Sequence, residues 1–169
     1  LDSGGLFQGK VGEYGVAFAA RRSYIDAIIP YFTGDSGFVV KPRWYDYQAK
    51  LMKVNGAKSK FSVFIFGFND KLLVSTPDDT AQGSDPDIQG DFGTTYESHR
   101  INFKWEHNLS KNHKIRLLPS IGMDRTIIDV GGGIRVDNIQ SISGMRAESI
   151  FKAGDHLSLT TGLDYALGF

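Results

Sequence analysis

Five aspartates gather between Ser75 and Thr95, where their carboxylates could act as metal ligands. They are Asp78, Asp79, Asp85, Asp87 and Asp91. Carboxylate oxygens are the ligands that Ca²⁺ prefers in proteins, but the spacing of these residues does not match an EF-hand loop. We therefore expect a solvated polar loop with no defined metal site. Weak Ca²⁺ binding by these carboxylates is the alternative.

The four histidines do not form a predicted metal or catalytic site. They are His99, His107, His113 and His156. His99 and His107 would share a strand, and a rise of ~3.4 Å per residue keeps them too far apart to hold one ion. His107, His113 and His156 fall near predicted turns, where we expect polar residues at an interface.

The sequence lacks the motifs of other common chemistries. There is no cysteine, which excludes disulfides, thiolate metal sites and cysteine catalysis. A G-x-S-x-G motif, an H-E-x-x-H motif and a complete P-loop motif, G-x-x-x-x-G-K-[ST], are all missing. Gly131 to Gly133 precede no helical pattern, so they predict a loop rather than a phosphate cradle. The sequence therefore predicts neither an enzyme nor a bound cofactor.

The amino-acid composition narrows the remaining classes of fold and of binding partner. Lys+Arg and Asp+Glu number 19 each, which argues against a nucleic-acid partner because such proteins carry a basic excess. The 20 glycines, the five prolines and an aromatic content of 12% favour strands and turns. No apolar run approaches the ~18 residues of a membrane-spanning helix. The chain begins LDSGG with no leader pattern, and we expect a piece of a longer polypeptide.

Alternation with a period of two dominates the chain and predicts strands with two unlike faces. Clear strands are predicted at 44–53, 96–109, 114–125 and 156–169, with a weaker one at 140–152. The segments 14–29 and 60–74 are apolar on both faces, so their orientation stays unassigned. A partial strand at 6–11 is doubtful. The prediction is an all-β antiparallel sheet of seven or eight long strands covering residues 1–169.

The connections between these strands alternate in length. Short turns are predicted at 54–59, where Asn55-Gly56 is a hairpin signal, and at 110–113 and 153–155. Longer connections are predicted at 31–42, 75–95 and 130–137. Outer-membrane barrels combine short periplasmic turns with long external loops. The strand lengths also reach the ~9–11 residues that cross a bilayer. We therefore predict part of a transmembrane β-barrel.

Alternation alone does not say which face lies inside, and two features favour lipid on the apolar side. The polar face mixes charges of both signs, and aromatic residues flank the first long connection in the manner of an interfacial girdle. The residues predicted to face lipid are Tyr45, Tyr47, Ile101, Phe103, Trp105, Leu157, Leu159, Leu163 and Tyr165. The residues predicted to line the lumen are Asp46, Gln48, Lys50, Arg100, Asn102, Lys104, Glu106, Arg146 and Asp164.

Three segments resemble the barrel of TonB-dependent outer-membrane receptors. They are GEYGVAFAARRSYIDAIIP (Gly12 to Pro30), RWYDYQAKLMKVNGAKSKFSVFIFGFNDKLLV (Arg43 to Val74) and MRAESIFKAGDHLSLTTGLDYALGF (Met145 to Phe169). The resemblance implies energy-coupled uptake of a siderophore or another bulky nutrient across a bacterial outer membrane. It also implies a plug domain and TonB as partners. No plug is present here, so the chain would be about the first third of a barrel of about 22 strands.

Two other interpretations remain open at this point. The final strand alternates apolar residues and ends at Phe169, which also suits a complete small barrel of eight strands with a structural or adhesion role. A soluble β-barrel that binds an apolar ligand would show the same alternation with its faces reversed.

Overall fold

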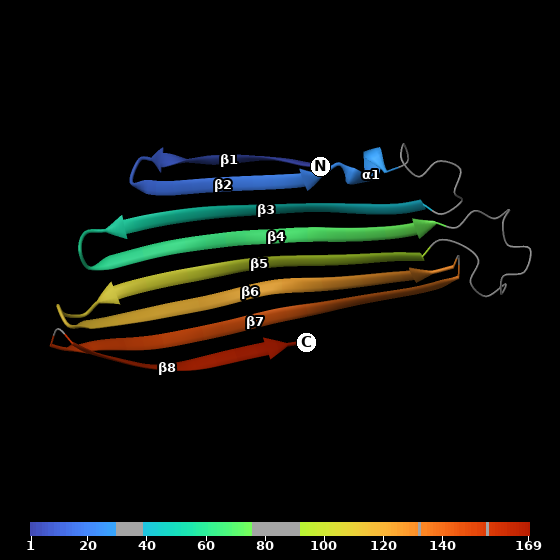
Figure 1. Cartoon of the computed structure of the whole chain (residues 1–169). Helices are drawn as coiled ribbons and strands as arrows, with labels where there is room; N and C mark the ends of the chain where they lie inside the picture. Colours follow the sequence, from blue (N-terminus) through green and yellow to red (C-terminus); the bar gives the residue numbers. More distant parts are fainter. Residues whose placement is uncertain (30–38, 76–91, 132, 155) are drawn as a thin grey trace, which may run out of the picture.

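The computed structural model describes residues 1–29, 39–75, 92–131, 133–154 and 156–169, and these residues form one antiparallel sheet (Figure 1). Eight strands follow one another in chain order, each hydrogen-bonded to the next. The strands are β1 (Asp2–Val11), β2 (Tyr14–Ser23), β3 (Val39–Asn55), β4 (Ser59–Ser75), β5 (Phe92–Asn108), β6 (His113–Val130), β7 (Ile134–Ala153) and β8 (Leu157–Gly168). A single helical turn, α1 (Ile25–Ile28), follows β2. The predicted all-β class, antiparallel pairing and strand number are confirmed.

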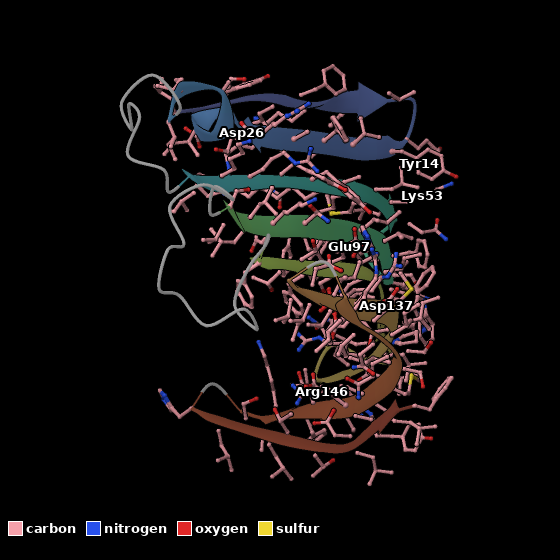
Figure 2. The ribbon with its side chains drawn as sticks, turned by 90° about the vertical axis from the view of Figure 1, so that its right-hand side faces the viewer. Tyr14, Asp26, Lys53, Glu97, Asp137 and Arg146 are labelled. Atoms are coloured by element: carbon pink, nitrogen blue, oxygen red, sulfur yellow. The ribbon has the colours of Figure 1, made fainter. Side chains whose placement is uncertain are left out.

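The sheet is twisted and curled but not closed, because β1 pairs only with β2 and β8 only with β7 among the described residues (Figure 2). The connections β1–β2, β3–β4, β5–β6 and β7–β8 gather at one end, which we call the turn end and which lies at the left of Figure 1. The opposite end is called the far end. No helix in the described part of the chain is long and apolar enough to span a membrane.

A single register runs through each strand pair, so every residue keeps a defined face across the sheet. Arg21 lies opposite Asp46, Asp46 opposite Phe68, and Phe68 opposite Ser98. We call the side of the sheet that carries Asp46, Arg100 and Arg146 the charged face, and the other side the apolar face. Because side chains alternate along a strand, the register fixes the face of every strand residue.

The sheet is one layer thick and has almost no apolar core. Ile127, at 8% exposure, is the one buried hydrophobic residue among those described. The accessible surface is 11907 Å², whereas a compact soluble protein of 18.7 kDa exposes roughly 8300 Å². Both faces of this single layer therefore remain largely accessible to solvent.

Glycine permits the tight hairpins at the turn end. Gly12 and Gly56 have φ values of 59° and 58°, which place them in the left-handed region where a Cβ is unfavourable. Asn55 pairs with Ser59 around the second of these turns. The predicted Asn-Gly hairpin is therefore confirmed.

The predicted long connection at 130–137 is wrong. Strand β6 continues to Val130 and β7 begins at Ile134, with Val130 opposite Ile134. Gly131, with a φ of 46°, allows this tight reversal. The polar residues that suggested a loop instead alternate along β7.

Four other predicted segments also differ in their bounds. The segment 14–29 is not one strand, because β2 ends at Ser23, whose hydroxyl accepts a hydrogen bond from the Ile25 N–H at 3.3 Å as α1 begins. The doubtful strand at 6–11 is a full ten-residue strand that pairs with β2 along its whole length. The predicted loops at 31–42 and 75–95 are partly strand, since β3 begins at Val39 and β5 at Phe92.

Candidate functional site

The nine residues predicted to line a lumen share the charged face. Asp46, Gln48 and Lys50 lie along β3, and the register brings Phe68, Phe66 and Phe64 of β4 opposite them. The same β4 residues lie opposite Ser98, Arg100 and Asn102 of β5. Lys104 and Glu106 follow on β5, and Arg146 of β7 lies opposite Asp164 of β8. The register thus brings these residues of four strands to one face of the sheet.

A continuous chain of ion pairs crosses four strands of the charged face. Lys104 contacts Glu106 at 3.2 Å, and Arg116 contacts the same carboxylate at 3.0 Å. Arg116 also contacts Glu148 at 2.8 Å. Arg146 lies 4.0 Å from Glu148, and its Nε donates a hydrogen bond to Asp164 at 2.8 Å. We call this the ion-pair chain, and its three cations and three carboxylates balance.

Two further ion pairs lie on the charged face nearer the far end. Arg100 binds Asp124 at 2.7 Å and donates to the Met123 and His99 carbonyl oxygens at 3.1 Å. Arg21 contacts Asp46 at 2.8 Å. The partners Arg116, Asp124 and Glu148 were not among the predicted site residues, since only the strand register brings them together.

The structure assigns the faces of β4, which sequence alternation did not. Phe64, Phe66 and Phe68 lie on the charged face, where Phe64 and Phe66 approach to 5.4 Å between ring centroids. Phe68 approaches Tyr96 of β5 to 5.5 Å. An aromatic stripe therefore runs along β4 between the charged clusters of β3 and β5.

The nine residues predicted to face lipid share the apolar face. Tyr45, Tyr47, Ile101, Phe103 and Trp105 lie there on β3 and β5, and the four β8 residues lie on the same side. Several large side chains on this face are widely exposed, with Ile121 at 52% and Leu163 at 81%.

A polar row bounds the apolar face toward the far end. Arg22, Tyr45, Asn69, Glu97 and Arg125 lie opposite one another across five strands. Asn69 donates to Glu97 at 2.7 Å, and Arg125 binds Asp137 of β7 at 2.6 Å. Arg22 lies over the Tyr24 ring at 5.7 Å. We call this set the far-end row.

A second polar row bounds the apolar face toward the turn end. Ser59 and His107 lie opposite each other and hydrogen-bond at 2.7 Å, and His113 hydrogen-bonds to Ser149 at 2.9 Å. His107 follows Glu97 of the far-end row by ten residues on β5. Between the two rows, Lys53 is the one Asp, Glu, Lys or Arg on the apolar face of the described strands, and it lies next to the turn-end row, with Phe61 opposite it.

Three of the histidines, His99, His107 and His113, serve as hydrogen-bond partners. His99 contacts the Tyr47 hydroxyl at 3.0 Å, and His107 stacks on Trp105 with 5.4 Å between ring centroids. In the described ranges, no three His, Cys, Asp or Glu residues come together to hold a metal ion. The aspartates Asp78, Asp79, Asp85, Asp87 and Asp91 lie outside those ranges.

An ion pair ties the first hairpin turn to β3 at the turn end. Glu13 lies 2.8 Å from Lys53, which also sits over the Tyr14 ring at 5.1 Å (Figure 2). The hydrogen bond from Lys53, followed by its charge, lowers the pKa of the Glu13 carboxyl below its ordinary value. The pair is therefore intact above that ordinary pKa and is lost as the pH falls through the lowered pKa.

Replacing Lys53 with methionine should raise the pKa of Glu13 toward the value of a free glutamate. A carboxyl ¹³C NMR titration of the two proteins measures this change directly. Glu13 is fully exposed, so the effect should appear in the titration midpoint rather than in unfolding. An unchanged midpoint in Lys53→Met would contradict the contact.

Comparisons with protein-family models, with curated proteins and with solved structures found no match to this chain.

Proposed function

We propose that this chain forms part of the wall of a transmembrane β-barrel, with its apolar face toward lipid and its charged face toward a water-filled interior. The observation that carries the proposal is the band of the apolar face between two polar rows, where Lys53 at the turn-end border is the one charged side chain among the described strands. Nine residues separate Glu97 from His107 on β5. That length matches the ~9–11 residues with which a tilted strand crosses a bilayer.

The charges on the opposite face of the same strand segments support this orientation over the reverse one. Between the levels of Glu97 and His107, the charged face holds Arg100, Lys104, Glu106, Arg116 and Asp124. An arginine or lysine facing lipid at the bilayer midplane costs about 2–4 kcal/mol. A wet interior accepts mixed charges, and the ion pairs balance them there.

The open edges of the sheet favour a larger barrel. Strands β1 and β8 each have one unpaired edge in the described structure. Unpaired backbone groups are not stable in lipid, so a spanning sheet must close on itself or continue into further strands. In this proposal, further strands complete the barrel on both sides.

The finer proposal is a TonB-dependent receptor of a bacterial outer membrane. It rests on the resemblance of Gly12 to Pro30, Arg43 to Val74 and Met145 to Phe169 to that family, together with the open sheet. The protein would then be a transporter and not an enzyme, importing a siderophore or another bulky nutrient. The lipid bilayer, a plug domain, TonB and the nutrient would be its partners, and the charged face would meet the plug or the nutrient path.

The two tryptophans test the orientation, because they lie on opposite faces. Trp105 belongs to the apolar band, whereas Trp44 lies on the charged face opposite Asp70. In vesicles of brominated phosphatidylcholine, Trp44→Phe, which retains Trp105, should show strong quenching of fluorescence. Trp105→Phe should show weak quenching by the lipid and ready quenching by aqueous iodide. The reverse pattern would invert the assignment, and no lipid quenching in either variant would refute a membrane location.

The mass of the native polypeptide tests the finer proposal. An antibody against this chain should detect, in the outer-membrane fraction, a protein several times larger than 18.7 kDa. A band near 18.7 kDa in that fraction would favour a complete small barrel. A band in the soluble fraction would favour a soluble barrel that binds an apolar ligand.

A further inference from the structure

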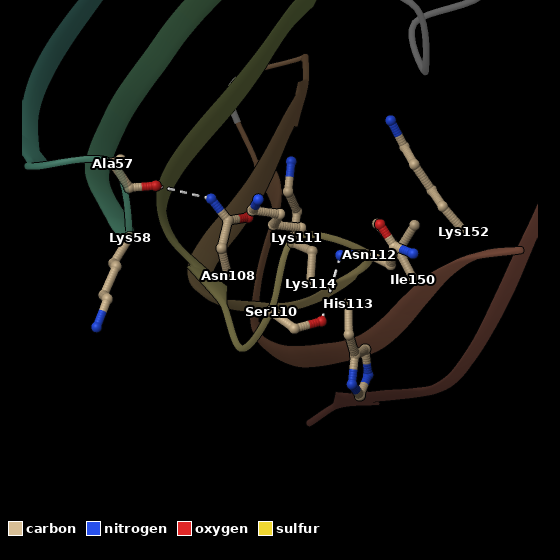
Figure 3. A pocket seen from close by; sticks show the side chains of 10 residues that line it. All are labelled: Ala57, Lys58, Asn108, Ser110, Lys111, Asn112, His113, Lys114, Ile150 and Lys152. Atoms are coloured by element: carbon tan, nitrogen blue, oxygen red, sulfur yellow. Dashed lines mark hydrogen bonds between the residues drawn. The ribbon is translucent and has the colours of Figure 1, made fainter. Parts of the chain in front are cut away.

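Three neighbouring connections at the turn end surround a hollow of about 530 Å³ (Figure 3). The β3–β4 turn supplies Ala57 and Lys58, the β5–β6 turn supplies residues 110–112, and the end of β7 supplies Lys152. Hydrogen bonds hold the connections together. Asn108 donates from its side chain to the Ala57 carbonyl and from its backbone to the Lys58 carbonyl, both at 2.8 Å. The Lys152 N–H donates to the Asn112 carbonyl at 2.8 Å.

Lysine dominates the lining of this hollow. Lys111, Lys114 and Lys152 line it together with Asn108, Ser110 and Asn112, and we call this set the lysine cradle. In Figure 3, Lys111 and Lys152 extend to the same side of the turns, and Lys58 and His113 extend to the other. Lys114 and Lys152 belong to the charged face by register. The cradle therefore opens at the turn-end rim of that face.

The positive charge of the cradle is not neutralised by described residues. None of its three lysines forms an ion pair within the described ranges. Glu106 and Glu148, carboxylates on the same face, already bind cations of the ion-pair chain. That chain is balanced, so the three cradle lysines add net positive charge at the rim.

We propose that the lysine cradle binds a phosphate group. A phosphate carries up to two negative charges and several acceptor oxygens, and lysine ammonium groups bind it as compact point charges. Three ammonium groups around one hydrogen-bonded hollow meet those requirements, whereas an apolar ligand would leave them unpaired. The phosphate could belong to a free polyphosphate or to a phospholipid headgroup. This inference goes beyond the proposed membrane role and does not depend on it.

Calorimetric titration of the whole protein with sodium tripolyphosphate tests the cradle. The variant Lys111→Gln/Lys114→Gln/Lys152→Gln should bind about tenfold more weakly than the parent, since each exposed charge pair contributes modestly. The matched control, Lys10→Gln/Lys41→Gln/Lys71→Gln, removes three exposed lysines elsewhere and should bind like the parent. Equal weakening in both variants would show non-specific charge attraction and overturn the proposal.

A second titration separates the two phosphate sources. Dihexanoyl-phosphatidylglycerol carries a phosphate with net charge, and dihexanoyl-phosphatidylcholine is the zwitterionic control. If the parent binds the first lipid but not tripolyphosphate, and the cradle variant binds that lipid more weakly, the cradle binds a lipid headgroup. If the parent binds tripolyphosphate and the cradle variant binds it more weakly, the cradle binds a free polyphosphate. Binding of neither probe by the parent overturns the proposal. The same titrations can be made if the protein proves to be soluble. Failure of the membrane proposal and failure of the phosphate-binding proposal can therefore be distinguished.

Discussion

Replacing Ile121 with arginine should prevent stable insertion of the protein into bilayers, whereas Ser120→Arg should be tolerated. Ile121 lies on the apolar face near the middle of the band between the two polar rows, opposite Ile101 and Ser143. Ser120 is its chain neighbour and points to the charged face, where Gly144 lies opposite it and leaves room. The two variants therefore place the same side chain at nearly the same depth on opposite faces.

The size of the effect distinguishes lipid from water. Arginine on the lipid face near the midplane costs about 2–4 kcal/mol, a large share of a typical folding free energy. The Ile121 side chain is 52% exposed in the isolated sheet. In water, a substitution at such a surface position usually changes stability by no more than about 0.5 kcal/mol. A large loss in Ile121→Arg is expected only if this face meets lipid.

Urea titrations of both variants in phosphatidylcholine vesicles measure the difference, with folding followed by tryptophan fluorescence. We expect a lower midpoint for Ile121→Arg and a midpoint near the parent value for Ser120→Arg. Equal stability of the two variants would refute the orientation of the faces. A loss confined to Ser120→Arg would indicate that the charged face meets lipid.

Replacing Arg116 with methionine should destabilise the sheet by about 2 kcal/mol, because the substitution leaves two carboxylates without their shared cation. Arg116 contacts Glu106 at 3.0 Å and Glu148 at 2.8 Å, on the strands at either side of β6. These carboxylates are only 14% and 16% exposed, so solvent replaces the lost contacts poorly. The loss should appear as a lower urea midpoint under the same vesicle conditions.

A neutral triple variant serves as the control for this loss. Glu106→Gln/Arg116→Met/Glu148→Gln removes the charges together and should recover much of the stability, since no unpaired charge remains. Arg116→Lys keeps the charge but not the two-sided guanidinium, and its midpoint should fall between those of the parent and Arg116→Met. If the triple variant is as unstable as Arg116→Met, packing rather than charge explains the effect of Arg116.

Sequence alternation predicted the faces wherever a strand has one apolar and one polar side. In β5, Ile101, Phe103 and Trp105 alternate with charged or amide residues, so the two sets separate without knowledge of the partners. In β4, Phe64, Phe66 and Phe68 alternate with other apolar residues, and no pattern distinguishes the faces. Only pairing with Arg100 and Asn102 assigns these phenylalanines to the charged face.

The missed features depend on contacts between residues far apart in the chain. Strand β1 is rich in glycine and has adjacent apolar residues at Leu6 and Phe7, so local propensity is weak and pairing with β2 decides its conformation. The start of β7 looks like a polar loop, yet Asp137 binds Arg125 across the strand pair. The ion-pair chain also needs the register of four strands, which periodicity does not contain.

Because Ile127 is the one buried hydrophobic side chain among the described residues, collapse in water would release little of the free energy that normally drives folding. Under the proposed orientation, lipid covers the large apolar side chains of this face. In the proposed setting, the strands acquire stable structure as they enter the bilayer, and folding and insertion form one coupled reaction. In that setting, the chain would expose its apolar side chains to water until it reaches the bilayer.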